Sequence, residues 1–191
     1  PTESALRGVV TQDELILAVG VAGTIVRGTS DALTASAMPN APNFAALAGT
    51  PSDALAVGER GFVAHIGPTG ATPVACDVQA SLRAVVRVGE VHWAAGENGS
   101  VVRIEGGQCV LEHQYATTGP ALNGIGRGPD GHLLAVGDMG SALVRQDDGT
   151  WTPLDLDVGS VSLRAVRTIY RWVFVVGAGG VILRHIRTDG E

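Results

Sequence analysis

The sequence contains no lysine, and its 13 basic residues, all arginine, are outnumbered by 19 acidic ones. This absence excludes chemistry that depends on a lysine amine, namely the P-loop lysine, the Schiff-base lysine and the lysine general base. The net charge is −6 and no run of basic residues occurs. Electrostatic capture of nucleic acid or of an anionic membrane surface is therefore not expected.

Aromatic residues make up only 4% of the chain and charged residues 17%, whereas 27 of the 191 residues are glycine. This composition suits short strands joined by tight turns and does not suit a helical bundle. The longest apolar stretch, residues 173–183, is too short and too interrupted by glycine to span a bilayer, so membrane insertion is not expected. The length is that of a single domain, residues 1–191.

Cysteine is scarce, and the spacing of Cys76 and Cys109 is no metal signature. A single disulfide is one interpretation, and two buried thiols are the favoured one. The five histidines never lie two or four residues apart, so we expect surface or hydrogen-bonded side chains and predict neither a metal site nor a cofactor. They are His65, His92, His113, His132 and His185.

One segment occurs five times with small changes, and each copy combines branched apolar residues with Gly-x-x-Gly. The copies are LAVGVAGTIVR at 17–27, LAVGERGFVAH at 55–65, WAAGENGSVVR at 93–103, LAVGDMGSALVR at 134–145 and FVVGAGGVILR at 174–184. The units start near residues 6, 44, 82, 122 and 163, always with Leu or Phe. A near-constant period of about 40 residues predicts a repeat architecture.

Each unit has the pattern of four short antiparallel strands, which we call a, b, c and d. In the third unit these strands are expected at 82–87, 91–95, 100–104 and 109–113. Both faces of strand b are apolar, which is typical of a sheet covered by other sheets. Four-stranded units of this length, each covering the next, predict an all-β fold, the β-propeller.

The glycines of Gly-x-x-Gly have separate expected roles. Strands b and c are joined by two residues, so one turn position must have a positive φ, and the second glycine is best placed to adopt it. These glycines are Gly23, Gly61, Gly99, Gly140 and Gly180. The first glycine is expected to allow a close approach of neighbouring chain. The residue before it should be buried between blades, at Val19, Val57, Ala95, Val136 and Val176.

The units resemble the repeats of the photosystem II stability and assembly factor family and the related Asp-box (BNR, sialidase-like) repeats. The resembling pattern is L-R-A-V, then W/L-A-V-G-x-x-G-T/S-x-V-R, then D-G-x-W, and RQDDGTW at 145–151 matches it best. The resemblance covers essentially the whole chain, although residues 105–109, EGGQC, depart from it. It implies a propeller that acts by binding proteins in a bacterial extracellular, periplasmic or cell-envelope setting, and it implies no activity.

The number of blades has two interpretations, because the fifth unit ends at Glu191, where its strand d should begin. One is a closed five-bladed ring whose last blade has three strands. The other is an arc of a larger propeller, completed by further blades or by a second chain. We favour the closed ring, because an open arc would expose two apolar blade faces.

A charged pattern also recurs in the units. Arginine occupies the second position of strand a at Arg7, Arg83 and Arg164, and an acidic residue follows the first glycine at Glu59, Glu97 and Asp138. Both sets are expected at the same end of a blade. They either form ion pairs within and between blades, which we favour, or leave arginines free to bind carboxylates.

Catalytic signatures are missing from the sequence. The glycine-rich stretch at 176–180 leads into a strand, which argues against a dinucleotide site, and no nucleophile elbow occurs. We therefore expect a non-catalytic protein-binding or scaffolding propeller, either an assembly factor or a subunit of a larger surface complex. A lectin-like propeller that binds glycans or small ligands is the alternative. A glycosidase-type enzyme ranks third.

Overall fold

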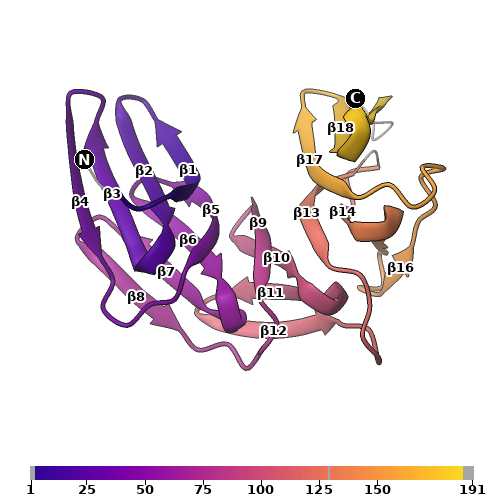
Figure 1. Ribbon diagram of the computed structural model, residues 1–191, viewed down its shortest axis with the longest axis horizontal. Coiled ribbons are helices and arrows are strands. Elements are labelled where there is room, and N and C mark those ends of the chain that lie inside the picture. Colours follow the sequence, from indigo (N-terminus) through magenta and orange to yellow (C-terminus); the bar gives the residue numbers. More distant parts are fainter. Residues whose placement is uncertain (1–2, 129, 187–191) are drawn as a thin grey trace. The chain divides into compact units, whose positions relative to one another are not determined.

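The chain folds entirely into β-sheets joined by short turns. The computed structural model describes residues 3–128 and 130–186, which form five antiparallel sheets (Figure 1). The chain divides into two compact units, one containing residues up to Ala94 together with Val102–Leu111 and the other containing Ala95–Val101 together with residues from Glu112 onward. No helix in the described part of the chain is long and apolar enough to cross a membrane.

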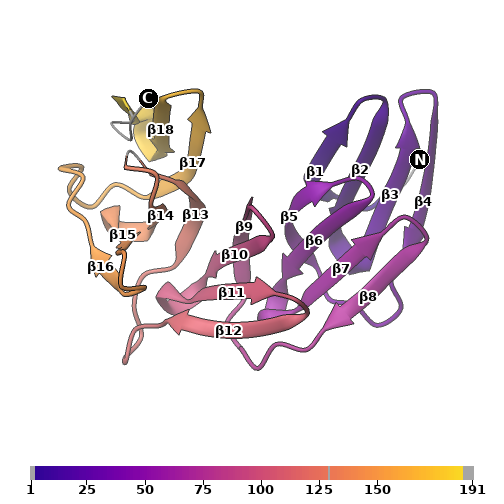
Figure 2. The ribbon, with the colours of Figure 1, turned by 180° about the vertical axis from the view of Figure 1, so that it is seen from behind.

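Each of the first three sheets has four strands in the predicted order, visible from behind in Figure 2. The first contains β1 (Leu6–Gln12), β2 (Leu15–Gly20), β3 (Thr24–Thr29) and β4 (Ala32–Ala37). The second contains β5 (Phe44–Thr50), β6 (Asp53–Gly58), β7 (Val63–Gly67) and β8 (Gly70–Val74). The third contains β9 (Leu82–Val88), β10 (Val91–Gly96), β11 (Val101–Glu105) and β12 (Gln108–His113).

The last two sheets differ in strand number. The fourth contains β13 (Leu122–Arg127), β14 (Leu133–Gly137), β15 (Ala142–Arg145) and β16 (Trp151–Pro153). The fifth contains β17 (Leu163–Ile169), β18 (Trp172–Gly177) and β19 (Ile182–Ile186). This agrees with the prediction that the last unit is three-stranded, although residues 187–191 lie outside the described residues.

The turn between strands b and c corrects one detail of the prediction. It is a three-residue 3-10 turn in every sheet: η1 (Val21–Gly23), η2 (Glu59–Gly61), η3 (Glu97–Gly99), η4 (Asp138–Gly140) and η5 (Ala178–Gly180). The second glycine has positive φ in all five turns, between 64° and 78°, as predicted. The residue before it also has positive φ, for example 57° at Arg60 and 58° at Met139. A three-residue connection reverses the chain by using two left-handed residues, so expecting a single one was wrong.

The first glycine of each pair is required by a close backbone approach. Gly58 is extended, at φ −166°, a value that any residue adopts. A Cβ at Gly58 would nevertheless lie 2.2 Å from the carbonyl oxygen of Asn43, just before strand β5. The same holds at Gly20, with 2.1 Å to the Ala5 oxygen. The sequence prediction of a close approach is confirmed.

Within each of the two compact units, successive sheets pack through the predicted apolar positions. Between the first and second sheets Val19 and Ile25 pack with Phe44 and Leu47. The residue before the first glycine is fully buried at Val19, Val57, Ala95 and Val136. Val176 is 38% exposed, contrary to the prediction, because no described residue covers that side of the fifth sheet as the next sheet covers its equivalents.

A disulfide joins the second and third units of the repeat. Cys76, which follows β8, is bonded to Cys109 in β12, with the two Cα atoms 5.0 Å apart. Both residues pack beside the core that Val57 and Leu82 share between the second and third sheets. The favoured interpretation of two buried thiols was therefore wrong.

Candidate functional site

The predicted arginines Arg7 and Arg164 lie at β-bulges at one end of the first and fifth sheets. Strand a pairs with strand b so that Leu6 faces Gly20 and Leu163 faces Gly177, and the register shifts over the next residue. Arg7 and Arg164 are these bulged residues. A bulge leaves one residue outside the ladder and redirects its side chain. Each arginine therefore lies at the end of its sheet that carries the Gly-x-x-Gly turn, as predicted.

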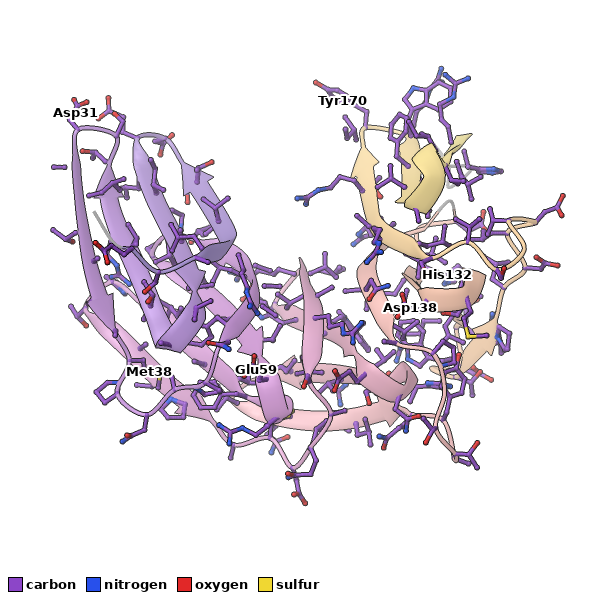
Figure 3. All side chains as sticks on the ribbon, viewed as in Figure 1. Asp31, Met38, Glu59, His132, Asp138 and Tyr170 are labelled. Carbon is purple, nitrogen blue, oxygen red and sulfur yellow. A yellow bond between two sulfur atoms is a disulfide. The ribbon has the colours of Figure 1, made fainter. Side chains whose placement is uncertain are left out.

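Asparagine side chains bind two of the three predicted acidic residues, Glu59 and Asp138, both labelled in Figure 3. The Asn43 amide donates to Glu59 at 2.7 Å, and its oxygen accepts from the Ala22 backbone N–H of the preceding sheet at 2.8 Å. Asn123, at the bulge position of β13, donates to Asp138 at 2.8 Å and to the Leu163 carbonyl of the next sheet at 3.0 Å. These amides tie neighbouring sheets together, which is the role we expected of arginine.

Arg7 and Arg164 are exposed, and neither side chain forms a hydrogen bond or an ion pair with a described residue. Arg83 is also exposed, but it has an interaction partner, as does Glu97. The favoured interpretation, in which the arginines pair with acidic residues, therefore does not describe Arg7 or Arg164. Their guanidinium groups are available to a carboxylate, which they can bind through two parallel hydrogen bonds.

A second polar site lies between the second and third sheets, at the end away from the Gly-x-x-Gly turns. Asp53, at the start of β6, accepts from His65 Nε2 at 2.8 Å and from Arg87 of the third sheet at 2.8 Å. Arg87 also pairs with Glu90 at 3.1 Å. The His65 hydrogen bond lowers the pKa of Asp53 below its usual 3.8, although burial opposes the shift.

His92 forms part of the wall of this second site and is the unusual residue of the cluster. The cavity has a volume of about 210 Å³, and Leu55 and Ile104 provide apolar wall beside it. His92 is buried, and its Nε2 atom has no hydrogen-bond partner within residues 3–128 and 130–186. Burial lowers the pKa of its imidazole below 6.5, and nearby Arg87 adds to the effect.

The sequence analysis missed the residues of this cluster and both asparagines. His92 carries a signal that was overlooked, because the equivalent position, four residues before the first glycine, is apolar in the other units. The residues equivalent to His92 in the other units are Ile16, Ala54, Leu133 and Val173. His92 is thus neither a surface residue nor hydrogen-bonded at Nε2, contrary to the expectation. The part of the chain that the structure describes contains no group of three or more His, Cys, Asp or Glu side chains able to hold a metal ion.

Comparisons with known proteins identify the fold of the chain. No protein-family model matches the sequence, and no curated protein sequence matches it significantly. The chain is similar to YCF48, a photosystem II assembly factor, solved bound to a D1 peptide: the TM-score is 0.74 at 18% identity, over 100% of this chain and 69% of that one. It is similar to virginiamycin B lyase from Staphylococcus aureus, with a TM-score of 0.77 at 12% identity over 97% and 71% of the two chains. It is also similar to the WD40 propeller domain of Doa1, with a TM-score of 0.79 at 10% identity over 100% and 68%.

These similarities show that the chain has the β-propeller fold. An assembly factor, a lyase and a WD40 domain share the fold at low identity, so the fold by itself carries no function. The five sheets correspond to about 70% of each propeller. This agrees with the second sequence interpretation, an arc of a larger propeller, and not with the closed five-bladed ring that we favoured.

Proposed function

We propose that the chain is a non-catalytic, protein-binding β-propeller module that acts outside the cytosol and binds acidic segments of its partner. The observation that carries this proposal is that two bulge arginines, Arg7 and Arg164, are exposed and have no partner among the described residues. Strand a borders the central channel of a propeller, and its Gly-x-x-Gly end opens on one face. A guanidinium held at this end by a bulge is suited to recognise a carboxylate.

Two further observations support the proposal. YCF48, which shares the fold, was solved bound to a D1 peptide. The disulfide between Cys76 and Cys109 supports an oxidising location, since such bonds are rare in the cytosol and common in secreted and periplasmic proteins. The location is therefore proposed as extracellular, periplasmic or cell-envelope associated.

The test uses a displayed library of random peptides, selected for binding to the purified chain. We expect acidic sequences to be enriched, and the affinity of a selected peptide to fall as salt rises. Replacing Arg7 and Arg164 together by alanine should weaken binding about tenfold or more while leaving the melting temperature unchanged, since neither side chain has a partner in the part of the chain that the structure describes. Arg167→Ala is the matched control, because Arg167 is exposed on the same strand as Arg164 and has no partner among the described residues. Selection of peptides without acidic residues, or equal loss of binding in the control, would contradict the proposal.

A lectin-like function is the second candidate, and the polar cavity of about 210 Å³ favours it. Charged planar groups from Asp53 and Arg87 lie beside aliphatic side chains there. A glycan array would show saturable binding that Arg87→Met removes if this candidate is right. The double alanine variant of Arg7 and Arg164 should leave such binding intact, which separates the two candidates.

A further inference from the structure

The fifth sheet carries an apolar face that its equivalents bury. We call front face the side of a sheet that packs on the following sheet, for example through Val19 and Ile25 of the first sheet. On the fifth sheet the equivalents of these residues are Val176, 38% exposed, and Ile182, 68% exposed. At the position of Ile182 the other sheets have Ile25, Val63, Val101 and Ala142, all buried.

The first sheet has exposed apolar residues on its opposite side, which we call the back face. The second sheet meets its predecessor with Phe44 and Leu47, both buried. The equivalent residues of the first sheet are Leu6, 46% exposed, and Val9, 62% exposed. The chain thus carries both halves of one blade-to-blade contact, and neither half is covered by the described residues.

We propose that these two faces pair between copies of the chain. The front face of the fifth sheet packs head to tail on the β1 side of the first sheet of a second copy. The contact repeats the one that neighbouring sheets make within each copy, so both partners already have the required spacing of apolar side chains. Burying Val176, Ile182, Leu6 and Val9 removes the exposed apolar area at both ends.

Charge complementarity at the edge of this contact supports the second copy as the occupant. Arg27, four residues after Gly23 in the first sheet, donates a hydrogen bond to the Pro68 carbonyl in the turn between β7 and β8. The equivalent of Arg27 in the fifth sheet is Arg184, which stacks on Trp172 at 4.6 Å and has no ion-pair partner among the described residues. The equivalent of the β7–β8 turn in the first sheet is Ser30–Asp31, and Figure 3 shows Asp31 at the tip of that hairpin. Head-to-tail docking therefore brings Arg184 to the Ser30–Asp31 turn of the second copy, where Asp31 supplies the carboxylate.

A hydroxyl provides a further match at the same contact. Thr168 in β17 donates to the Arg127 carbonyl of the preceding sheet at 2.7 Å. Thr11 holds the same position in β1, where it is exposed. In the proposed contact, Thr11 of the second copy reaches the backbone of β17 as Thr168 reaches that of β13. An apolar centre, an ion pair and a hydroxyl donor thus all agree with one docking geometry.

The association is measured by sedimentation velocity over a wide range of protein concentration. We expect the wild-type chain to form concentration-dependent dimers or longer assemblies, because a head-to-tail contact leaves one free face at each end. Ile182→Glu and Val9→Glu should each abolish association. Leu111→Glu should not, because Leu111 is similarly exposed, at 43%, but lies on the third sheet.

A charge exchange tests the direction of the contact. Arg184→Asp and Asp31→Arg should each weaken self-association about tenfold, because each variant places like charges opposite one another. An equimolar mixture of the two variants should associate as well as the wild type, because every contact between unlike copies pairs opposite charges. A wild-type chain that is monomeric at all concentrations would overturn the proposal. In that case the front face of the fifth sheet and the back face of the first sheet would pack on each other or bind a different polypeptide. Assemblies that resist Ile182→Glu, or a mixture that stays monomeric, would also overturn it. This outcome is independent of peptide binding at Arg7 and Arg164.

Discussion

Gly58 and Asn43 are held so close that no side chain fits between them. A Cβ at Gly58 would lie 2.2 Å from the Asn43 carbonyl oxygen, which also accepts the Glu59 N–H at 3.1 Å. Gly58→Ala should therefore lower the free energy of unfolding by about 1–3 kcal/mol, through steric overpacking and not through φ. Gly70→Ala is the control in the same sheet, because a Cβ there meets no atom within 4 Å. Equal denaturant midpoints for the two variants would contradict this account.

Arg60 is strained by the turn that Gly61 closes. Its φ is 57°, a left-handed value that costs a residue with a side chain about 1–2 kcal/mol. Arg60→Gly should raise the free energy of unfolding by up to about 1 kcal/mol, since glycine relieves the strain but loses more entropy on folding. Urea unfolding followed by circular dichroism measures the difference. A destabilised Arg60→Gly variant would mean that the side chain makes a contact that offsets its strain.

The features of the fold that could be predicted from the sequence are those that recur in the repeat units. The turn glycines and the apolar residue before the first glycine recur in every unit, so each position was supported several times over. Val176 holds the same repeat position as Val57, but its burial depends on what covers the last sheet, which a repeat pattern does not contain. The disulfide could not be predicted, because its formation depends on the distance in the folded chain between cysteines of two different repeat units. Asn43 precedes strand a, where the other units have Ala5, Ser81, Ala121 and Ser162, and Asn123 stands at the arginine position in a single unit only. No periodic signal therefore marked either asparagine.

The disulfide should contribute measurably to stability. Cys76 and Cys109 are 33 residues apart, and closing a loop of this size in the unfolded chain stabilises the folded state by about 2–4 kcal/mol. A Cys76→Ser and Cys109→Ser double variant should lose this amount in urea unfolding. Adding reductant to the wild-type protein should lower its stability to the same level. If reductant has no effect on the purified protein, the cysteines are thiols in solution.

Val57 and Val176 test the difference between a covered and an uncovered blade face. Both precede the first glycine of their units, but Val57 is fully buried and Val176 is 38% exposed. Val57→Asp buries an unpaired charge and should cost several kcal/mol, enough to unfold a marginal domain. Val176→Asp should fold, because its carboxylate can remain hydrated. Thermal unfolding compares the two, measured at low protein concentration so that association does not contribute. Equal losses would show that the fifth sheet is covered in solution.

The stability of the chain should depend on pH through His92. Its pKa is lowered by burial in the folded state, so the unfolded state, in which the imidazole titrates near 6.5, binds the proton more tightly. The free energy of unfolding should therefore fall as the pH drops below about 6.5. Asp53 acts in a separate window: its folded pKa is below 3.8, so the stability it contributes is lost only as the pH falls below that value.

His92→Leu separates the two windows. The other units have an apolar residue at this position, and the substitution also removes a buried Nε2 atom to which no described residue is hydrogen-bonded. We expect the variant to be more stable than the wild type by about 1–3 kcal/mol at acidic pH and to lose the dependence below pH 6.5. The dependence below pH 3.8 should remain, because the ion pair of Asp53 with Arg87 is untouched. His132→Gln, at a partly exposed histidine, is the control and should keep the wild-type profile, whereas an unchanged profile in His92→Leu would place the titrating group elsewhere.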